Sequence, residues 1–397
     1  MEKILRRLAA MALACAVCSP AHAVQYSLFD LGSLTPGERM WGTALNDLGQ
    51  VVGYSYGDRL DDGISGSNQY HAFGTAIDGR GLYGLGSQGG QWSTAADINN
   101  AGQIVGATQI DDGTSRGYIA SGGAMTTVGT LGRNNGLLSR INDRGQVVGL
   151  SWNQQGARPL DLPRDYLGVV GDTSGALRTF SGPAGQPLQG QGLNELGQVV
   201  GETVSIGNGP GPRLVFVTGP DATAPVPVFA DTVSAIGINN AGVVTGQRAV
   251  IAAIWGGTAF IGTPGGTQEY LDFSGVANYL PGYVNAPGGD QYLKTTSYGA
   301  ALNELGQVAG RFQTFGTSFA FITGPDGHGV INPDTLFTLP DGDHFVAAAD
   351  VNERGQFILN SALGHTYLLS PIPEPATWAL WAGGASLLVW RRRHPRT

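Results

Sequence analysis

The chain has 397 residues, of which 64 are glycine, about twice the usual share, while only 13% are charged. This composition argues against helical bundles and coiled coils. The 42% of hydrophobic residues, with aromatic residues throughout the chain, argues against disorder. The net charge of −8 and the pI near 5.2 lack the positive charge that nucleic-acid binding requires, so we expect no nucleic-acid partner.

Residues 1–23 have the pattern of a secretory signal peptide. Basic residues come first, an apolar run follows over residues 8–17, and Ala21 and Ala23 form the small-x-small site that signal peptidase cleaves. We expect cleavage after Ala23. The alternative, an uncleaved membrane anchor, fits less well because the apolar run is only about 10 residues long and a span needs about 20.

Both cysteines of the chain, Cys15 and Cys18, lie in this segment, and the residues before them lack the pattern of a lipoprotein signal. The mature protein is therefore expected to contain no cysteine. It would have no disulfide, no thiol nucleophile and no thiolate ligand for a metal.

A motif of Asn-x-x-Gly followed by a small apolar run recurs seven times, about every 50 residues, a period typical of propeller blades and other repeat arrays. The seven pairs are Asn46 and Gly49, Asn99 and Gly102, Asn142 and Gly145, Asn194 and Gly197, Asn239 and Gly242, Asn303 and Gly306, and Asn352 and Gly355.

The motif predicts a hairpin turn. Asn at the first position of a type I turn hydrogen-bonds the backbone ahead of it, and Gly at the fourth supplies a positive φ. The run that follows, such as Gln-Val-Val-Gly at residues 50–53, predicts a strand. Its terminal Gly either relieves crowding against a neighbour or forms a bulge.

Each unit offers further short strands. Stretches before the turns include residues 41–45, 95–98, 234–238 and 346–351. Aromatic stretches lie at residues 71–73, 117–119, 178–180, 215–217, 259–261, 320–322 and 366–368. A last set includes residues 82–86, 127–132 and 335–339. Four short strands per repeat make a blade, so the sequence predicts an all-β fold, a closed seven-bladed β-propeller.

The phase of the blades stays open. If their boundaries lie at the Asn-x-x-Gly turn, the stretches at 26–32 and 41–45 complete a last blade that 357–360 and 366–369 begin. If they lie after the aromatic strand, seven whole blades follow in line. An open solenoid would need capping ends, which we do not find. Because the third and fifth units carry long insertions, we expect the least regular blades there.

This array resembles the HAF family of bacterial extracellular repeats, which is named for the His-Ala-Phe seen here at residues 71–73. Leu-Gly and Ile-Asn-x-x-Gly-Gln-Val-Val-Gly elements follow it, and the likeness covers nearly all of residues 24–370. Only the first unit keeps the full His-Ala-Phe, with Ser-Phe-Ala-Phe at 318–321 the nearest match elsewhere. The resemblance implies export and repetition, and no catalytic residue.

Candidate chemistry is sparse. No catalytic or phosphate-binding motif is found, and the histidines outside the two terminal segments have no metal-ligand spacing: His71, His328, His344 and His365. We therefore expect no enzyme activity and no cofactor. Calcium is a lesser alternative at three acidic patches, where Asp-Gly is first of all a turn signal. Their acidic residues are Asp58, Asp61, Asp62, Asp111, Asp112, Asp341 and Asp343.

The insertions at residues 152–175 and 262–297 are the most plausible binding loops, because aromatic side chains on a rigid ring can stack on sugars. Their candidate residues are Arg158, Arg164, Tyr166, Tyr270, Phe273, Tyr279, Tyr283, Tyr292 and Lys294. The plainer interpretation is that these aromatic side chains pack against the ring. A polysaccharide lyase or hydrolase is the alternative function, and its candidate carboxylates are Asp165, Glu269, Asp272 and Asp290.

The C-terminal segment begins with a Pro-Glu-Pro motif, continues with an uncharged apolar run over residues 376–390, and ends in a basic tail. The motif and the first basic residues are Pro373, Glu374, Pro375, Arg391, Arg392 and Arg393. The arginines should stay cytoplasmic. This end resembles the PEP-CTERM sorting signal of Gram-negative bacteria, which implies recognition by an exosortase and removal of the tail. An ordinary single-pass tail anchor is the alternative.

The sequence thus predicts a signal peptide over 1–23, a repeat propeller over 24–370, and a sorting signal with a short transmembrane helix over 371–397. The chain would pass through the inner membrane, meeting signal peptidase and exosortase. It would then act at the cell surface or in the extracellular matrix as a non-catalytic interaction protein, with exopolysaccharide as its partner.

Overall fold

The structure is a computed structural model that describes residues 24–57, 70–153, 166–182, 186–203, 215–228, 232–249, 257–273, 276, 295–314 and 317–372. Leu28–Leu369 form one compact unit. A second unit joins Met1–Ser27 and Ser370–Thr397. The signal-cleavage residues, the Pro-Glu-Pro motif, the apolar run and the basic tail lie outside the described residues. No helix within the described ranges is long and apolar enough to cross a membrane.

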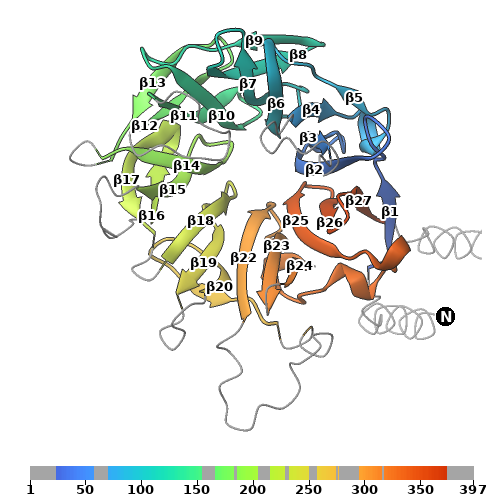
Figure 1. The fold of residues 1–397 in the computed structure, drawn as a ribbon. Coiled ribbons are helices and arrows are strands. Elements are labelled where there is room, and N and C mark those ends of the chain that lie inside the picture. Colours follow the sequence, from blue (N-terminus) through green and yellow to red (C-terminus); the bar gives the residue numbers. More distant parts are fainter. Residues whose placement is uncertain are drawn as a thin grey trace, which may run out of the picture. The chain divides into compact units, whose positions relative to one another are not determined.

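Seven antiparallel sheets follow one another around a central axis in the described part of the chain, which confirms the predicted seven-bladed β-propeller (Figure 1). Blade 1 contains β2 (Glu38–Leu45), β3 (Val51–Gly57), β4 (Tyr70–Gly74) and β5 (Tyr83–Gly84). Blade 2 contains β6 (Gly89–Ile98), β7 (Ile104–Ile110), β8 (Ser115–Ser121) and β9 (Ala124–Thr127). Blade 3 contains β10 (Asn135–Ile141), β11 (Gln146–Trp152), β12 (Tyr166–Asp172) and β13 (Leu177–Phe180).

The remaining blades repeat this order from the inside outward. Blade 4 contains β14 (Leu188–Leu193), β15 (Val199–Thr203), β16 (Val215–Gly219) and β17 (Thr223–Pro227). Blade 5 contains β18 (Thr232–Ile238), β19 (Val244–Ala249), β20 (Gly257–Gly262) and β21 (Gln268–Tyr270). Blade 6 contains β22 (Thr295–Leu302), β23 (Val308–Thr314) and β24 (Thr317–Ile322). Blade 7 contains β25 (Phe345–Val351), β26 (Phe357–Ser361), β27 (Thr366–Pro371) and β1 (Tyr26–Asp30).

Short 3-10 turns connect the strands where Pro or Asp-Gly occurs. They are η1 (Ile77–Gly79), η3 (Pro220–Ala222), η6 (Pro325–Gly327), η7 (Pro333–Thr335) and η8 (Pro340–Gly342).

Blade 7 closes the ring, because its outermost strand comes from the other end of the chain. The strand order is β1-β27-β26-β25. Beyond β1, the backbone N–H of Leu31 donates to the Thr366 carbonyl at 3.0 Å, and Leu31 packs against Met40, Ile358 and Leu368. The blade is thus made from both ends of the chain, but by one N-terminal strand only. Residues 41–45, which one of the two phases would add to this blade, belong to β2 of blade 1.

Four expectations about the blades are wrong, one of them the strand at 127–132, because β9 ends at Thr127. Blades 3 and 5 each have four strands, whereas blade 6 has three among the described residues. Its expected fourth strand at 335–339 is absent because Pro333 starts η7 there, and the Asn332 side chain accepts from the Asp334 N–H instead. In blade 3 the aromatic stretch at 178–180 forms the fourth strand, β13, and the third strand, β12, has Val169 where other blades have an aromatic residue.

The hydrophobic core lies between neighbouring blades. Ala44, Val52 and Ala72 of blade 1 pack against Ala95 and Tyr118 of blade 2, among others. The third strands contribute fully or almost fully buried aromatic side chains, namely Phe73, Tyr118, Phe216, Phe260 and Phe321. Burying each side chain stabilises the fold by about 1.5–3 kcal/mol.

The Gly at the end of each Val-Val-Gly run makes room for a bulge in the partner strand. The β6–β7 register shifts between Ala95 and Asp97, and a Cβ on Gly106 would lie 2.0 Å from the Thr94 carbonyl oxygen. The same holds for Gly149 in blade 3, whose Cβ would lie 2.1 Å from the Leu137 carbonyl oxygen. Of the two predicted roles, relief of crowding is therefore confirmed.

Candidate functional site

The seven asparagines form a closed ring of hydrogen bonds around the axis. As predicted, each motif is a turn: Gly49 has φ +71° and its N–H donates to the Asn46 carbonyl at 2.9 Å. The Asn46 Oδ1 accepts from the backbone N–H of Leu48 and Gln50. The Nδ2 of each asparagine donates to the carbonyl of the next: Asn46 to Asn99 at 3.0 Å, Asn99 to Asn142 at 3.1 Å, Asn142 to Asn194 at 2.9 Å, Asn194 to Asn239 at 2.9 Å, Asn239 to Asn303 at 3.2 Å, Asn303 to Asn352 at 2.9 Å, and Asn352 to Asn46 at 2.9 Å.

We did not predict this contact between blades from the sequence, although a signal for it exists. An aspartate would form the same turn, because its carboxylate accepts the same backbone N–H groups. Aspartate has no donor for the next carbonyl, however. The use of Asn at all seven positions is what a ring of donors requires.

The residues that follow the asparagines form a second ring, which we call the rim. Its members are Asp47, Asn100, Asp143, Glu195, Asn240, Glu304 and Glu353. The side-chain oxygen of each accepts from the backbone N–H of the corresponding residue in the preceding blade, as in the bond from Asp47 N–H to Asn100 Oδ1 at 2.7 Å. Burial raises the pKa of Glu195 and of Glu353.

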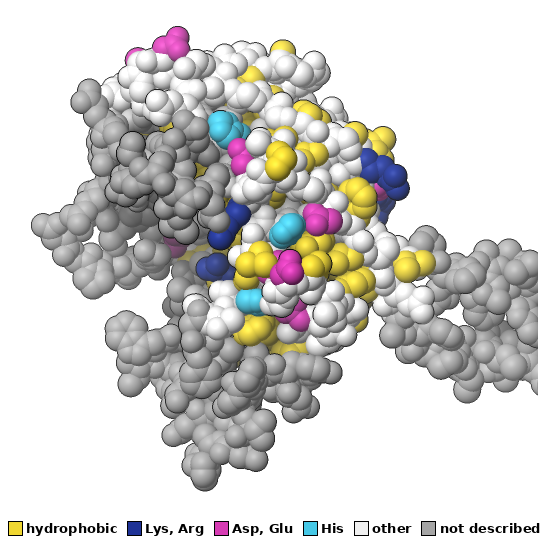
Figure 2. Space-filling model, turned by 45° about the vertical axis from the view of Figure 1, so that its right-hand side comes forward, with side chains coloured by type: hydrophobic (Ala, Val, Ile, Leu, Met, Phe, Trp, Pro, Cys, Tyr) yellow, Lys and Arg dark blue, Asp and Glu magenta, His cyan; other side chains and the backbone are white. Residues whose placement is uncertain are grey.

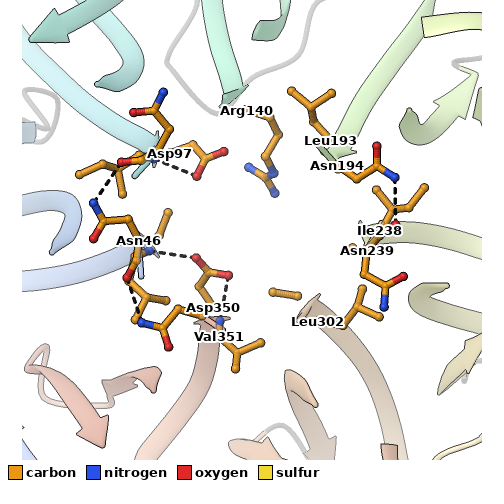
Figure 3. Close-up of a pocket in the computed structure, with 18 of the residues that line it drawn as sticks. Asn46, Asp97, Arg140, Leu193, Asn194, Ile238, Asn239, Leu302, Asp350 and Val351 are labelled. Atoms are coloured by element: carbon orange, nitrogen blue, oxygen red, sulfur yellow. Dashed lines mark hydrogen bonds between the residues drawn. The ribbon is translucent and has the colours of Figure 1, made fainter. Parts of the chain in front are cut away.

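A cavity of about 380 Å³ lies on the axis and is lined by the rim, the asparagines and the ends of the innermost strands (Figure 3). This volume is at the lower end of the range for small-molecule sites, about 300–1,000 Å³. Its charged wall is formed by Asp97 of blade 2, Arg140 of blade 3 and Asp350 of blade 7, whose side chains point into the cavity (Figure 3).

These three side chains occupy one repeated position, two residues before the ring asparagine. The other four blades have Ala44, Gly192, Gly237 and Ala301 there. Leu193, Ile238 and Leu302, from blades 4, 5 and 6, also line the cavity. The charges at this strand position thus come from three blades, whereas apolar side chains line the cavity on every side, among them Leu45 and Val351 beside the aspartates.

Each aspartate bridges its own blade and the next along the ring. Asp97 accepts from the N–H of Ile98 and of Ile141, and Asp350 accepts from the N–H of Val351 and of Leu45, each at 2.9 Å. Burial raises the pKa of Asp97 to about 6, against the lowering effect of the Arg140 guanidinium.

Burial, with the Asp97 charge as the next cause, raises the pKa of Asp350 to about 7. At neutral pH the cavity thus holds carboxylates whose charge Arg140 compensates only in part. Such a wall can accept protons or hydrogen bonds and can pair with a cation.

The carboxylates that we singled out for an enzyme do not line this cavity. Glu269 lies on β21, the outermost strand of blade 5, and Asp272 follows shortly after it; both are exposed. Asp165 and Asp290 lie outside the described residues. We did not predict from the sequence that Asp97, Arg140 and Asp350 lie together, because they come from three different blades.

Of the described aromatic residues in the two insertions, some pack against the ring and one is exposed, as a binding loop would require. Phe273 packs against Phe312 and Phe321, with ring centroids 5.7 and 5.0 Å away, so it contributes to the core. Tyr270 is 48% exposed, and the Arg248 guanidinium lies 5.1 Å from its ring centroid. Tyr166 is buried in β12. The other candidates in these loops, Arg158, Arg164, Tyr279, Tyr283, Tyr292 and Lys294, lie outside the described residues.

The acidic patches form turns where they are described. Asp112 and Gly113 make the β7–β8 hairpin turn, in which the Thr114 hydroxyl and N–H hold the pKa of Asp112 below its usual range. Asp341 lies in η8 with φ +56°. Asp58, Asp61 and Asp62 lie outside the described residues. No group of three or more His, Cys, Asp or Glu that could hold a metal ion occurs in the described ranges.

The side of the molecule that carries blades 1 and 7 shows few Lys and Arg side chains, with acidic and histidine side chains among hydrophobic ones (Figure 2). One of the histidine contacts joins the two ends of blade 7. His365 Nδ1 of the segment before β27 lies 3.4 Å from Asp30 Oδ2 of β1.

Comparisons with solved structures agree with the fold. The β-propeller domain of the trilobed protease from Pyrococcus furiosus, which has an open velcro topology, matches with a TM-score of 0.53 and 11% identity over 84% of this chain and 94% of that one. Acylaminoacyl peptidase from Pyrococcus horikoshii matches with a TM-score of 0.52 and 10% identity, over 89% of this chain and 55% of that one.

Oligogalacturonate lyase from Vibrio parahaemolyticus matches with a TM-score of 0.51 and 10% identity, over 89% of this chain and 98% of that one. Identities this low establish a shared propeller fold and leave function open. No protein-family model and no curated protein matches the sequence.

Proposed function

We propose that this protein is an exported, surface-sorted and non-catalytic binding protein of the cell-surface or exopolysaccharide matrix, and that its ligand enters the axial cavity. The observation that carries the proposal is the cavity itself: about 380 Å³, framed by a closed ring and lined by an excess of carboxylates. The signal peptide and the Pro-Glu-Pro sorting motif in the sequence support the location.

The geometry suits binding for a physical reason. The ring fixes the backbone on both sides of Asp97, Arg140 and Asp350, so the cavity loses little conformational entropy when it takes a ligand. Its hydrogen-bonding groups and its apolar side chains together match the two kinds of surface that a sugar unit presents, hydroxyl groups and C–H faces.

The location is tested by intact-mass and C-terminal peptide mass spectrometry of the protein recovered separately from membranes, cell surface and medium. We expect a chain that starts at Val24 and ends near Pro373–Pro375 in the surface or medium fraction. A chain that keeps Arg391–Arg393 and occurs only with the inner membrane would overturn the sorting proposal in favour of a tethered protein.

The function is tested by co-sedimentation of the mature protein with purified exopolysaccharide, followed by assays for new reducing ends and unsaturated products. We expect binding without either product. Chain cleavage would replace this proposal with the lyase or hydrolase alternative, and no co-sedimentation would remove the polysaccharide partner.

A further inference from the structure

The axial cavity carries a strong excess of negative charge. Seven carboxylates and one guanidinium line it: Asp47, Asp97, Asp143, Glu195, Glu304, Asp350 and Glu353, with Arg140 as the cation. Because these groups converge on one axis, their potentials add, and a low-dielectric wall concentrates the field. The five rim carboxylates accept backbone N–H groups of the neighbouring turns, which accounts for their presence structurally.

Asp97 and Asp350 also accept backbone N–H groups of the next blade, from Ile141 and Leu45, but the ring closes elsewhere without a carboxylate at their position. The same repeated position holds Ala44, Gly192 or Gly237 in other blades, which form the same bulge and the same ring contact. A fold that closes with Gly or Ala at this position does not need a carboxylate there. Two partly buried acidic side chains whose like charges repel lower the stability of the fold. Such an unfavourable arrangement is characteristic of binding sites.

The opposite wall narrows the chemistry of the ligand. Leu193, Ile238 and Leu302 contribute apolar surface across the cavity from the two aspartates (Figure 3). A ligand that suits this lining has a cationic group for the two aspartates and a C–H face for the apolar side chains. A hexosamine unit with a free amino group has both features, because its ammonium offers three N–H donors beside a pyranose ring.

We infer that the axial cavity binds an amino-sugar unit of a partly or fully de-N-acetylated polysaccharide, with its ammonium group between Asp97 and Asp350. This inference rests on the proposed function and specifies its ligand. Arg140 opposes the ammonium, since it lies on the same charged wall and compensates part of the carboxylate charge.

The test is isothermal titration of the mature protein with the β-1,4 tetramer of glucosamine, beside the tetramer of N-acetylglucosamine, which has the same rings without the charge. We expect one site for the glucosamine tetramer and no measurable heat for the acetylated one. Equal binding of both tetramers, or binding of neither, would overturn the inference.

The variants Asp97→Ala and Asp350→Ala place at each position a residue that blades 1 and 6 already have there. The double variant should therefore fold, which its thermal unfolding curve checks, and should bind the glucosamine tetramer about tenfold more weakly or worse. Arg140→Ala should bind it more tightly. Asp341→Asn removes one charge from an exposed turn away from the cavity and should bind like the wild type.

Unchanged affinity in the double variant would overturn the site assignment. Spermidine serves as a second probe: if it binds at the same residues while the glucosamine tetramer does not, the site takes an amine but the sugar assignment is wrong. The two proposals remain separable. If native exopolysaccharide co-sediments equally with the wild type and with the double variant, polysaccharide binding as proposed above stands. The assignment of an amino sugar to Asp97 and Asp350 is then rejected.

Discussion

The Asn352 side-chain amide donates to the Asn46 carbonyl at 2.9 Å, so the last repeat is joined to the first by the same contact that joins every other pair of neighbours. The two residues lie at opposite ends of the propeller sequence. Their contact exists only when the ring is closed, and it therefore reports closure directly.

Replacing Asn352 by Asp tests this contact. The variant keeps the Oδ1 that accepts from the N–H of Arg354 and Gln356, but it places a second oxygen against the Asn46 carbonyl. Because the residue is buried, we expect a loss of about 2–4 kcal/mol in the free energy of unfolding, measured by urea titration. Asn134→Asp, at an exposed site, should change it by less than about 0.5 kcal/mol, and equal effects of both variants would contradict the role of the ring.

The N-terminal segment should contribute to closure mainly through Leu31, the residue after β1. This side chain is 7% exposed and packs against residues of blades 1 and 7. Leu31→Ala would leave a cavity there, so we expect a loss of about 2–4 kcal/mol in the free energy of unfolding. Leu48→Ala removes the same atoms from a side chain that is 43% exposed, and a comparable loss in that variant would show that burial at the closure is not the cause.

Much of the repeat could be predicted from sequence because its signals are local. The Asn-x-x-Gly turn and the Val-Val-Gly strand depend on residues that are adjacent in the chain, and both are as predicted. The strand that we predicted at 335–339 of blade 6 does not form, because the turn made by Asn332 and Pro333 outweighs the apolar pattern there.

The candidate site could not be predicted in the same way. Asp97, Arg140 and Asp350 share one position in the repeat, but no local pattern marks them, and they come together only when blades 2, 3 and 7 surround the same cavity (Figure 3). A comparison of the repeats position by position would have shown that this position is Gly or Ala in four blades and charged in three.

The Gly of the Val-Val-Gly run leaves no room for a side chain. A Cβ at Gly106 would overlap the backbone carbonyl of Thr94, which cannot move without disturbing the bulge. We expect Gly106→Ala to lower the free energy of unfolding by about 2–3 kcal/mol or to prevent folding. Gly129 has no atom within 4 Å of its Cβ position and no positive φ, so Gly129→Ala should have little effect by the same chemical denaturation. Equal stabilities of the two variants would contradict the steric argument.

The paired aspartates predict an unusual dependence of stability on pH. The pKa of Asp97 is raised from an ordinary 3.8 to about 6 and that of Asp350 from 3.8 to about 7, so both bind protons more readily in the folded state. Stability rises with pH only where the unfolded state binds more protons. Here the folded state binds more, and these two groups lower stability as the pH rises from about 4 to about 7.

The double variant Asp97→Ala, Asp350→Ala removes this contribution. Relative to wild type, the variant should therefore be more stable at pH 8 than at pH 4. We expect its free energy of unfolding, minus that of wild type, to be larger at pH 8 by on the order of 1–3 kcal/mol, as measured by urea titration at both pH values. The comparison between the two pH values cancels the constant cost of the lost hydrogen bonds to Ile141 and Leu45. A difference between variant and wild type that is the same at both pH values would mean that the two carboxylates titrate normally, and that the cavity does not hold uncompensated charge.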